Sequence, residues 1–164
     1  MSMADLEEGL KLIADADDKM VSGPKTTDEI EAAETALGLK FPPTYRRFLA
    51  ECGSGGAGGE EFYGLTRNPD FVNSSVPNAI WLTLKHRQKY SLPAELVLVY
   101  ALGDGTLYAV DTSQGGALGE SPVIEWPSGP PPERRRVVSS DFGIFLRNRI
   151  ASALAVDDDI DDDL

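Results

Sequence analysis

Side chains that commonly carry out chemistry are scarce in this chain of 164 residues. It has one cysteine, Cys52, and one histidine, His86, which cannot form a zinc site of thiolate and imidazole ligands. The two could form a nucleophile–base pair, but no local motif connects positions so far apart. A single cysteine allows no intramolecular disulfide, which is typical of a reducing compartment. We therefore expect no metal site and no cofactor.

Two further patterns could be read as catalytic. The glycine-rich segment 53–59 resembles a phosphate-binding loop, but such a loop ends in Lys followed by Ser or Thr, whereas Glu60 and Glu61 follow here and would repel phosphate. We interpret the segment as a flexible turn from helix to sheet. Glu120 and Glu125 could form the carboxylate pair of a hydrolase, but their spacing gives no reason to expect that they face each other.

The charge of the chain limits its partners. The 15 Lys and Arg residues stand against 27 Asp and Glu, a formal net charge of −12. Six aspartates lie in residues 157–164, so the remainder carries −12 + 6 = −6. Binding to nucleic acid relies on Lys and Arg displacing counterions from phosphates, which makes a basic protein surface the more natural partner. The sequence has no signal peptide and no apolar stretch long enough to span a bilayer, so we expect a cytoplasmic protein.

Apolar spacing predicts the helices that position these residues. One helix is expected over residues 4–20 and a second over 27–37, where Thr26 and Glu29 form a capping box and Gly38 suits the left-handed position after the end. Further helices are expected from Pro42 and Pro43 onwards, over 78–90, and after a cap at Ser140 or Ser139. Cys52 falls on an apolar helix face, and His86 in a basic cluster that we expect to be exposed.

The strands follow local turns. They are expected at residues 61–65, 96–100, 106–111 and 122–126, with an edge strand near Val137 and Val138. Local hairpins imply antiparallel pairing, and helices segregated from strands imply an α+β domain. We therefore predict an antiparallel sheet of about 4–6 strands, with N-terminal helices and a C-terminal helix around it. The domain is expected over residues 1–155, followed by a disordered acidic tail over 156–164.

Four segments together resemble a known family. They are residues 30–49 (with Leu37-Gly38-Leu39-Lys40-Phe41-Pro42-Pro43), the hairpin 99–111, residues 119–126 and residues 141–146. They are similar to the SUKH superfamily, named in part for fungal SMI/KNR cell-wall regulators and rich in bacterial immunity proteins. Cys52-Gly53 stands where the family often has Asn-Gly, and residues 66–95 match no family block. The resemblance implies an α+β fold without catalytic activity that binds and neutralises a polymorphic toxin, often a nuclease.

An immunity protein must cover a site that grips phosphates, so acidic and aromatic side chains are its natural contacts. The acidic candidates are Glu60, Glu61, Asp104, Asp111, Glu120 and Glu125, and the aromatic ones are Tyr63, Tyr108 and Trp126. Asp104 also suits a turn, Asp111 could simply end a strand, Tyr108 and Trp126 could pack in the core, and the tail could serve solubility. The alternative function is a regulatory scaffold of the SMI/KNR type.

Overall fold

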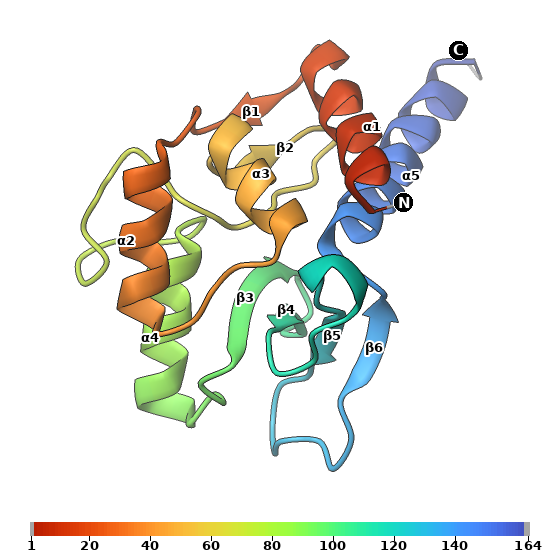
Figure 1. The fold of residues 1–164 in the computed structure, drawn as a ribbon. Coiled ribbons are helices and arrows are strands. Elements are labelled where there is room, and N and C mark those ends of the chain that lie inside the picture. Colours follow the sequence, from red (N-terminus) through yellow and green to blue (C-terminus); the bar gives the residue numbers. More distant parts are fainter. Residues whose placement is uncertain (1, 163–164) are drawn as a thin grey trace.

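The computed structural model describes residues 2–162, and the side chains of all of these except 117 and 156–162. Figure 1 shows helices gathered above and beside a twisted sheet. The elements in chain order are α1 (Ser2–Asp15), β1 (Met20–Val21), α2 (Thr27–Leu37), α3 (Pro43–Glu51), β2 (Gly55–Gly56), α4 (Ala79–Tyr90), β3 (Leu96–Ala101), β4 (Leu107–Asp111), the 3-10 turn η1 (Ala117–Gly119), β5 (Val123–Trp126), β6 (Arg136–Ser139) and α5 (Phe142–Asp162).

The sheet confirms the predicted α+β class. Strands β3, β4, β5 and β6 form one antiparallel sheet in that order, and β1 and β2 form a second, two-stranded one. Helices α1, α2 and α3 precede the larger sheet and α5 follows it. The edge strand expected near Val137 and Val138 is β6, and both valines are exposed.

The second and third helices form as their sequences predict. Thr26 and Glu29 make both hydrogen bonds of the capping box, and Gly38 ends α2 with a φ of 71°. Pro43 opens α3, where a missing N–H costs nothing. Cys52, just after α3, is buried as expected, and burial raises the pKa of its thiol to about 11.

The centre of the four-stranded sheet is buried on both faces, whereas β6 at its edge is mostly exposed. Side chains alternate along β4, so Val110 faces a core shared with α1, α3 and α5, whereas Ala109 faces a smaller core beneath α4. Aromatic rings fill the larger core, with Phe142 contacting Tyr45, Phe48 and Phe62 at centroid distances of 4.9–6.0 Å.

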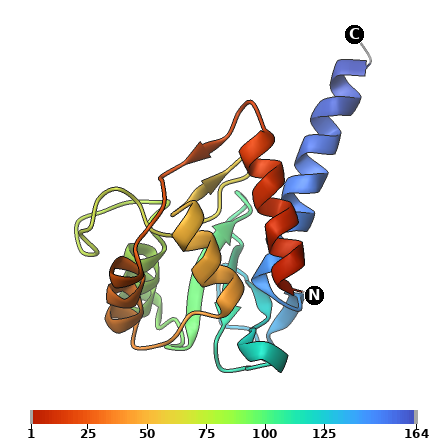
Figure 2. The same ribbon diagram turned by 45° about the horizontal axis from the view of Figure 1, so that its top comes forward.

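Helices α1 and α5 lie side by side, and the end of α5 projects beyond the body (Figure 2). Two glycines permit this close approach, because a Cβ added to Gly9 would press on the Leu146 side chain and one added to Gly143 on the Ser2 carbonyl. Asp5 accepts a hydrogen bond from Arg147 at 2.6 Å, which joins residues 142 positions apart.

Three boundary predictions differ from the structure. The first helix ends at Asp15 rather than residue 20, since Asp17 and Asp18 follow at the negative end of the helix dipole. The last helix is capped by Asp141, whose Oδ1 accepts the Ile144 N–H at 2.9 Å, rather than by Ser139 or Ser140. Residues 61–65 form isolated bridges at Phe62 and Gly64 instead of a strand.

The C-terminal boundary stays a prediction. Helix α5 runs to Asp162, so residues 156–162 are helical in the structure, whereas the sequence predicts a tail without regular structure from 156. Residues 163–164 lie outside the described part. Over the described residues, no helix is long and apolar enough to cross a membrane.

Candidate functional site

The glycine-rich segment is buried and well packed, which corrects the expectation of a flexible turn. Its residues 53–57 are buried, and Gly55 and Gly56 form β2 against β1. Gly55 has a φ of 109°, and an added Cβ would overlap the Met20 carbonyl oxygen. An added Cβ on Gly56 would likewise overlap the Glu60 carbonyl oxygen. The glycines therefore serve close backbone approach, and they bring β1 next to Glu60 and Glu61.

This arrangement creates an acidic surface with an apolar centre. We define the β1 surface as Asp17, Asp18, Met20, Val21 and Glu61, all of them exposed; the exposed Lys19, between Asp18 and Met20, donates to the Ala14 carbonyl at 3.3 Å. The Met20 side chain, in the paired strand β1, is 78% exposed, as much as the most exposed other large apolar side chain described, Val72 at 77%. Asp18 accepts the Gly58 N–H at 3.0 and 3.2 Å and so ties this surface to the glycine-rich segment. The three carboxylates form no ion pair with a described residue.

Glu60 has a structural task beneath this surface. Its carboxylate accepts hydrogen bonds from the Tyr100 hydroxyl and, at 3.2 Å, from Arg149. The Arg149 guanidinium also lies over the Tyr100 ring, 4.9 Å from its centroid. Burial, with the neighbouring Glu60 carboxylate, raises the pKa of Tyr100 to about 12. Glu60 thus fastens the glycine-rich segment to β3 and α5 and does not belong to the free face.

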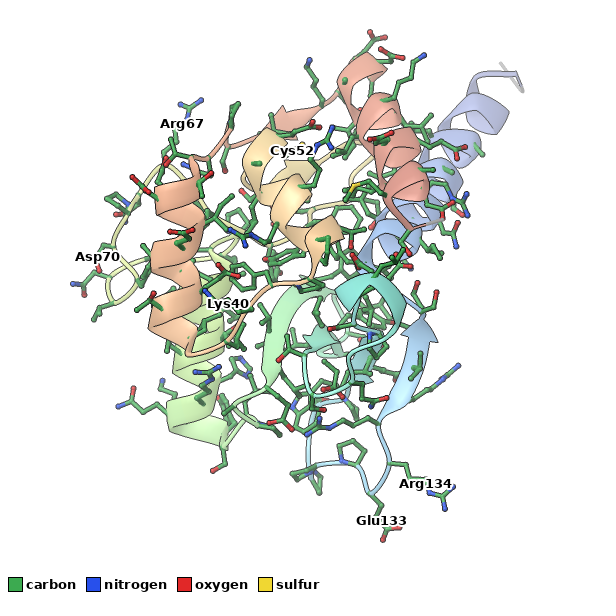
Figure 3. All side chains as sticks on the ribbon, viewed as in Figure 1. Lys40, Cys52, Arg67, Asp70, Glu133 and Arg134 are labelled. Carbon is green, nitrogen blue, oxygen red and sulfur yellow. The ribbon has the colours of Figure 1, made fainter. Side chains whose placement is uncertain are left out.

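A groove of about 690 Å³ adjoins the β1 surface. One wall is β1 with Ser22, Ser54 and Gly55, and the other is the loop 66–77. Arg67 donates from Nε to the Ser22 carbonyl at 3.3 Å and so links the two walls. Figure 3 shows Asp70 at the outer edge of this loop. Hydrogen bonds from the Val72 and Asn73 backbone lower the pKa of the Asp70 carboxyl and order the loop.

Two predicted contact residues are buried within the fold. Asp111 is fully buried and accepts hydrogen bonds from Ser113, Gln114 and Arg135. Burial opposes its ionisation, but Ser113 and Arg135 outweigh that effect and hold the pKa of the carboxyl below its usual value. We leave Asp111 out of the proposed contact surface.

Glu120 is buried as well. It accepts the Thr44 N–H and hydroxyl, both at 2.8 Å, and so caps the first turn of α3 from a distant part of the chain. Burial raises the pKa of the Glu120 carboxyl, against the Thr44 bonds that lower it. Both oxygens of its carboxylate are thus hydrogen-bonded to Thr44 inside the protein, and we leave Glu120 out of the contact surface too.

The remaining candidates are spread over other regions. Tyr63 is buried, and its carbonyl accepts the Tyr45 hydroxyl at 2.8 Å. Tyr108 packs on Phe145, and Trp126 packs at the edge of the smaller core. Asp104 is exposed but accepts the Thr106 N–H at 2.9 Å, as its turn interpretation expects.

Glu125 pairs with Arg136 at 3.3 Å, while Glu120 bonds to Thr44, so the two carboxylates have separate partners and not a shared site. Cys52 lies in the larger core. His86, which we expected to be exposed, is half-buried and packs on Tyr90 with a ring centroid distance of 4.9 Å. In the described part of the chain, no three Asp, Glu, His or Cys side chains gather as they would around a metal ion.

The sequence profile described as SMI1-KNR4 cell-wall (SUKH_5) matches residues 6–150. The chain belongs to the SUKH family. A comparison with curated proteins gives no match. The SUKH match contains the whole β1 surface, whereas the aspartate-rich residues 157–164 lie beyond it.

Sequence reasoning about this SUKH protein found Glu61 but missed the other four residues of the β1 surface. Asp17, Asp18 and Met20 were assigned to the first helix, where Met20 would extend an apolar stripe. The signal that could have found them is the Asp17-Asp18 pair itself, because two carboxylates disfavour the C-terminal end of a helix. A helix that stops before them leaves Met20 free to enter a strand.

Proposed function

We propose that this SUKH protein is a non-enzymatic immunity protein that binds and neutralises a cognate toxin through its β1 surface. The observation that carries the proposal is an exposed Met20 next to the carboxylates of Asp17, Asp18 and Glu61, which form no ion pair with a described residue. In this proposal the protein acts in the cytoplasm and needs neither cofactor, membrane nor nucleic acid.

Physical complementarity supports the choice of partner. A toxin that cleaves nucleic acid must expose Lys and Arg to grip phosphates, and carboxylates that lack ion partners complement such a site. Opposite charge also speeds encounter, and a net charge of −12 strengthens this steering at low salt. Met20 adds apolar contact, and its unbranched side chain adapts to the shape of the partner.

The first experiment is growth rescue. The toxin domain encoded nearest this gene is expressed in a sensitive host with and without this protein, and calorimetry measures direct binding. We expect rescue together with a Kd in the nanomolar range. Absence of both rescue and binding would refute the immunity role and favour the regulatory scaffold of the SMI/KNR type.

A pair of matched variants tests the surface itself. Asp17→Lys with Glu61→Lys reverses two charges on the β1 surface, and Glu31→Lys with Glu133→Lys reverses two exposed charges elsewhere. Figure 3 shows Glu133 at the tip of the β5–β6 loop. Both double variants change the net charge equally, so long-range steering falls equally in both.

We expect the β1-surface variant to weaken toxin binding about tenfold or more, and the other variant by about twofold or less. Equal losses from both would show that net charge rather than this surface carries the interaction.

A further inference from the structure

A pocket of about 390 Å³ lies between the last turns of α4 and the β5–β6 loop, and the proposed function does not use it. Figure 1 shows this loop at the opposite end of the molecule from β1. We call it the Trp126 pocket, and its lining includes His86, Tyr90, Leu107, Trp126, Ser128 and Pro131. Its volume lies within the range of pockets that hold a small ligand or a short peptide segment.

Aromatic rings from two elements form an open surface at this pocket. Tyr90, the last residue of α4, is 63% exposed, and Trp126, the last residue of β5, is half-buried at the edge of the smaller core. The His86 ring packs on Tyr90, with 4.9 Å between the ring centroids. Such rings offer flat apolar faces to a ligand, and surface aromatic residues are enriched where proteins bind partners.

The polar side chains of the pocket are hydrogen-bond donors without a partner in the protein. The indole N–H of Trp126 can only donate, and the hydroxyls of Tyr90 and Ser128 can donate as well. No described residue hydrogen-bonds to any of these three side chains. Burial, with the nearby Lys85, lowers the pKa of His86, so its imidazole is neutral at pH 7. The described lining residues thus carry no charged group, and none has an amide side chain.

This inventory favours a ligand that brings apolar rings and hydrogen-bond acceptors. A polyproline segment brings both, because each of its peptide bonds has a carbonyl oxygen but no N–H. It forms an extended left-handed helix without internal hydrogen bonds, so its carbonyls are free to accept from donors beside an aromatic groove. A saccharide or an ordinary peptide also brings donors, and the pocket has no carboxylate or amide side chain to accept them.

We propose that the Trp126 pocket binds an exposed polyproline segment of a partner protein. Its proline rings pack on Tyr90 and Trp126, and its carbonyl oxygens accept from the Trp126 indole and the Ser128 hydroxyl. The surface already accommodates prolines of this chain, because Pro127 and Pro131 line the same pocket. The pocket is separate from the β1 surface, so it adds a second protein contact to the toxin contact of the proposed function.

Titration of the isotope-labelled full chain by NMR tests the pocket directly. The probe is a blocked peptide of six L-prolines. The first control is the same peptide made of D-proline, which has the same composition but the mirror-image helix, and the second is a linear glucose oligosaccharide. We expect saturable shifts of the Trp126 indole N–H and the Ser128 amide with the L-proline peptide, and binding at least about tenfold weaker for both controls.

Three variants identify the contact. Tyr90→Ala removes an exposed ring and should weaken binding about tenfold, while Trp126→Phe keeps a ring but removes the indole N–H and should weaken it about fivefold. Val72→Ala, which shortens a side chain that is 77% exposed in the loop 66–77, is the matched control and should stay within about twofold. Because Tyr90 is exposed, the test does not depend on how well the Trp126 variant folds.

Several results would overturn the proposal. They are the absence of shifts at the pocket with the L-proline peptide, equal binding of the D-proline peptide, unchanged binding by Tyr90→Ala, and shifts of the Trp126 indole with the oligosaccharide alone. No toxin takes part in this titration, so its failure leaves the immunity role standing, and failure of growth rescue leaves the Trp126 pocket standing.

Discussion

Two adjacent arginines offer a sharp test of how burial changes the strength of an ion pair. Arg135 donates to the fully buried Asp111 at 3.0 Å and to Glu95 at 2.6 Å. Arg136, the next residue, pairs with Glu125 at 3.3 Å and is itself 79% exposed. The same substitution to methionine at each position therefore removes the same group from two different environments.

The expected loss at Arg135 follows from what remains around Asp111. Removing one partner of a buried pair costs roughly 3–5 kcal/mol, because the other charge stays buried without compensation. Asp111 keeps its bonds from Ser113 and Gln114, and the Arg135 side chain is 25% exposed in the native protein. We therefore expect Arg135→Met to lower the free energy of unfolding by about 2–3 kcal/mol, and Arg136→Met by less than about 1 kcal/mol.

Urea denaturation at pH 7 and near pH 3 measures both losses. The lowered pKa of Asp111 contributes stability that is present above the pKa of an unfolded Asp, near 3.9, and is lost as pH falls through the folded pKa. The deficit of Arg135→Met should therefore shrink in acid, because Asp111 is then protonated in the variant. Losses at the two arginines that agree within about 0.5 kcal/mol at pH 7, or a deficit at Arg135 that grows in acid, would refute this reasoning.

Three further predictions concern other parts of the molecule. Gly55→Ala should lower the free energy of unfolding by about 2 kcal/mol or more, since its Cβ overlaps the Met20 carbonyl and its φ disfavours other residues, and thermal unfolding against Gly59→Ala, whose Cβ would meet no atom, measures this. Thr26→Ala should cost about 1 kcal/mol through loss of the α2 cap, measured by urea denaturation. The free energy of unfolding of Glu120→Gln, taken relative to that of the native protein, should be more favourable at pH 7 than at pH 4. Burial raises the pKa of Glu120, so ionisation of this carboxyl costs the native protein stability as pH rises; unfolding curves at both pH values check the sign.

Local sequence signals were sufficient to predict an element where a residue type at a given position has a single structural role. The capping box of Thr26 and Glu29 and the terminal Gly38 determine α2 at both ends. The apolar run of β3 predicts a strand buried on both faces, which the structure confirms. Such features depend on neighbours only a few positions away, so no knowledge of the tertiary fold is needed.

The candidate site depends on contacts between distant segments, and prediction was weaker there. Gly55 suits flexibility and close approach equally well, and only the position of Met20, far away in the sequence, decides between them. Asp111 and Glu120 looked like surface carboxylates because their partners Arg135 and Thr44 are 24 and 76 positions away. Carboxylate content predicted an acidic protein, but it could not say which carboxylates the fold itself would use.

The pairing of α1 with α5 has a consequence for how the protein is made. Synthesis proceeds from the N-terminus, so the apolar stripe of Leu6, Leu10 and Ile13 leaves the ribosome long before the helix that covers it. Until Arg147 and its neighbours emerge, that stripe stays open to chaperones and to other unfinished chains. A chain that stops before α5 would leave the same stripe exposed. We therefore expect cellular proteases to degrade truncated chains faster than complete ones.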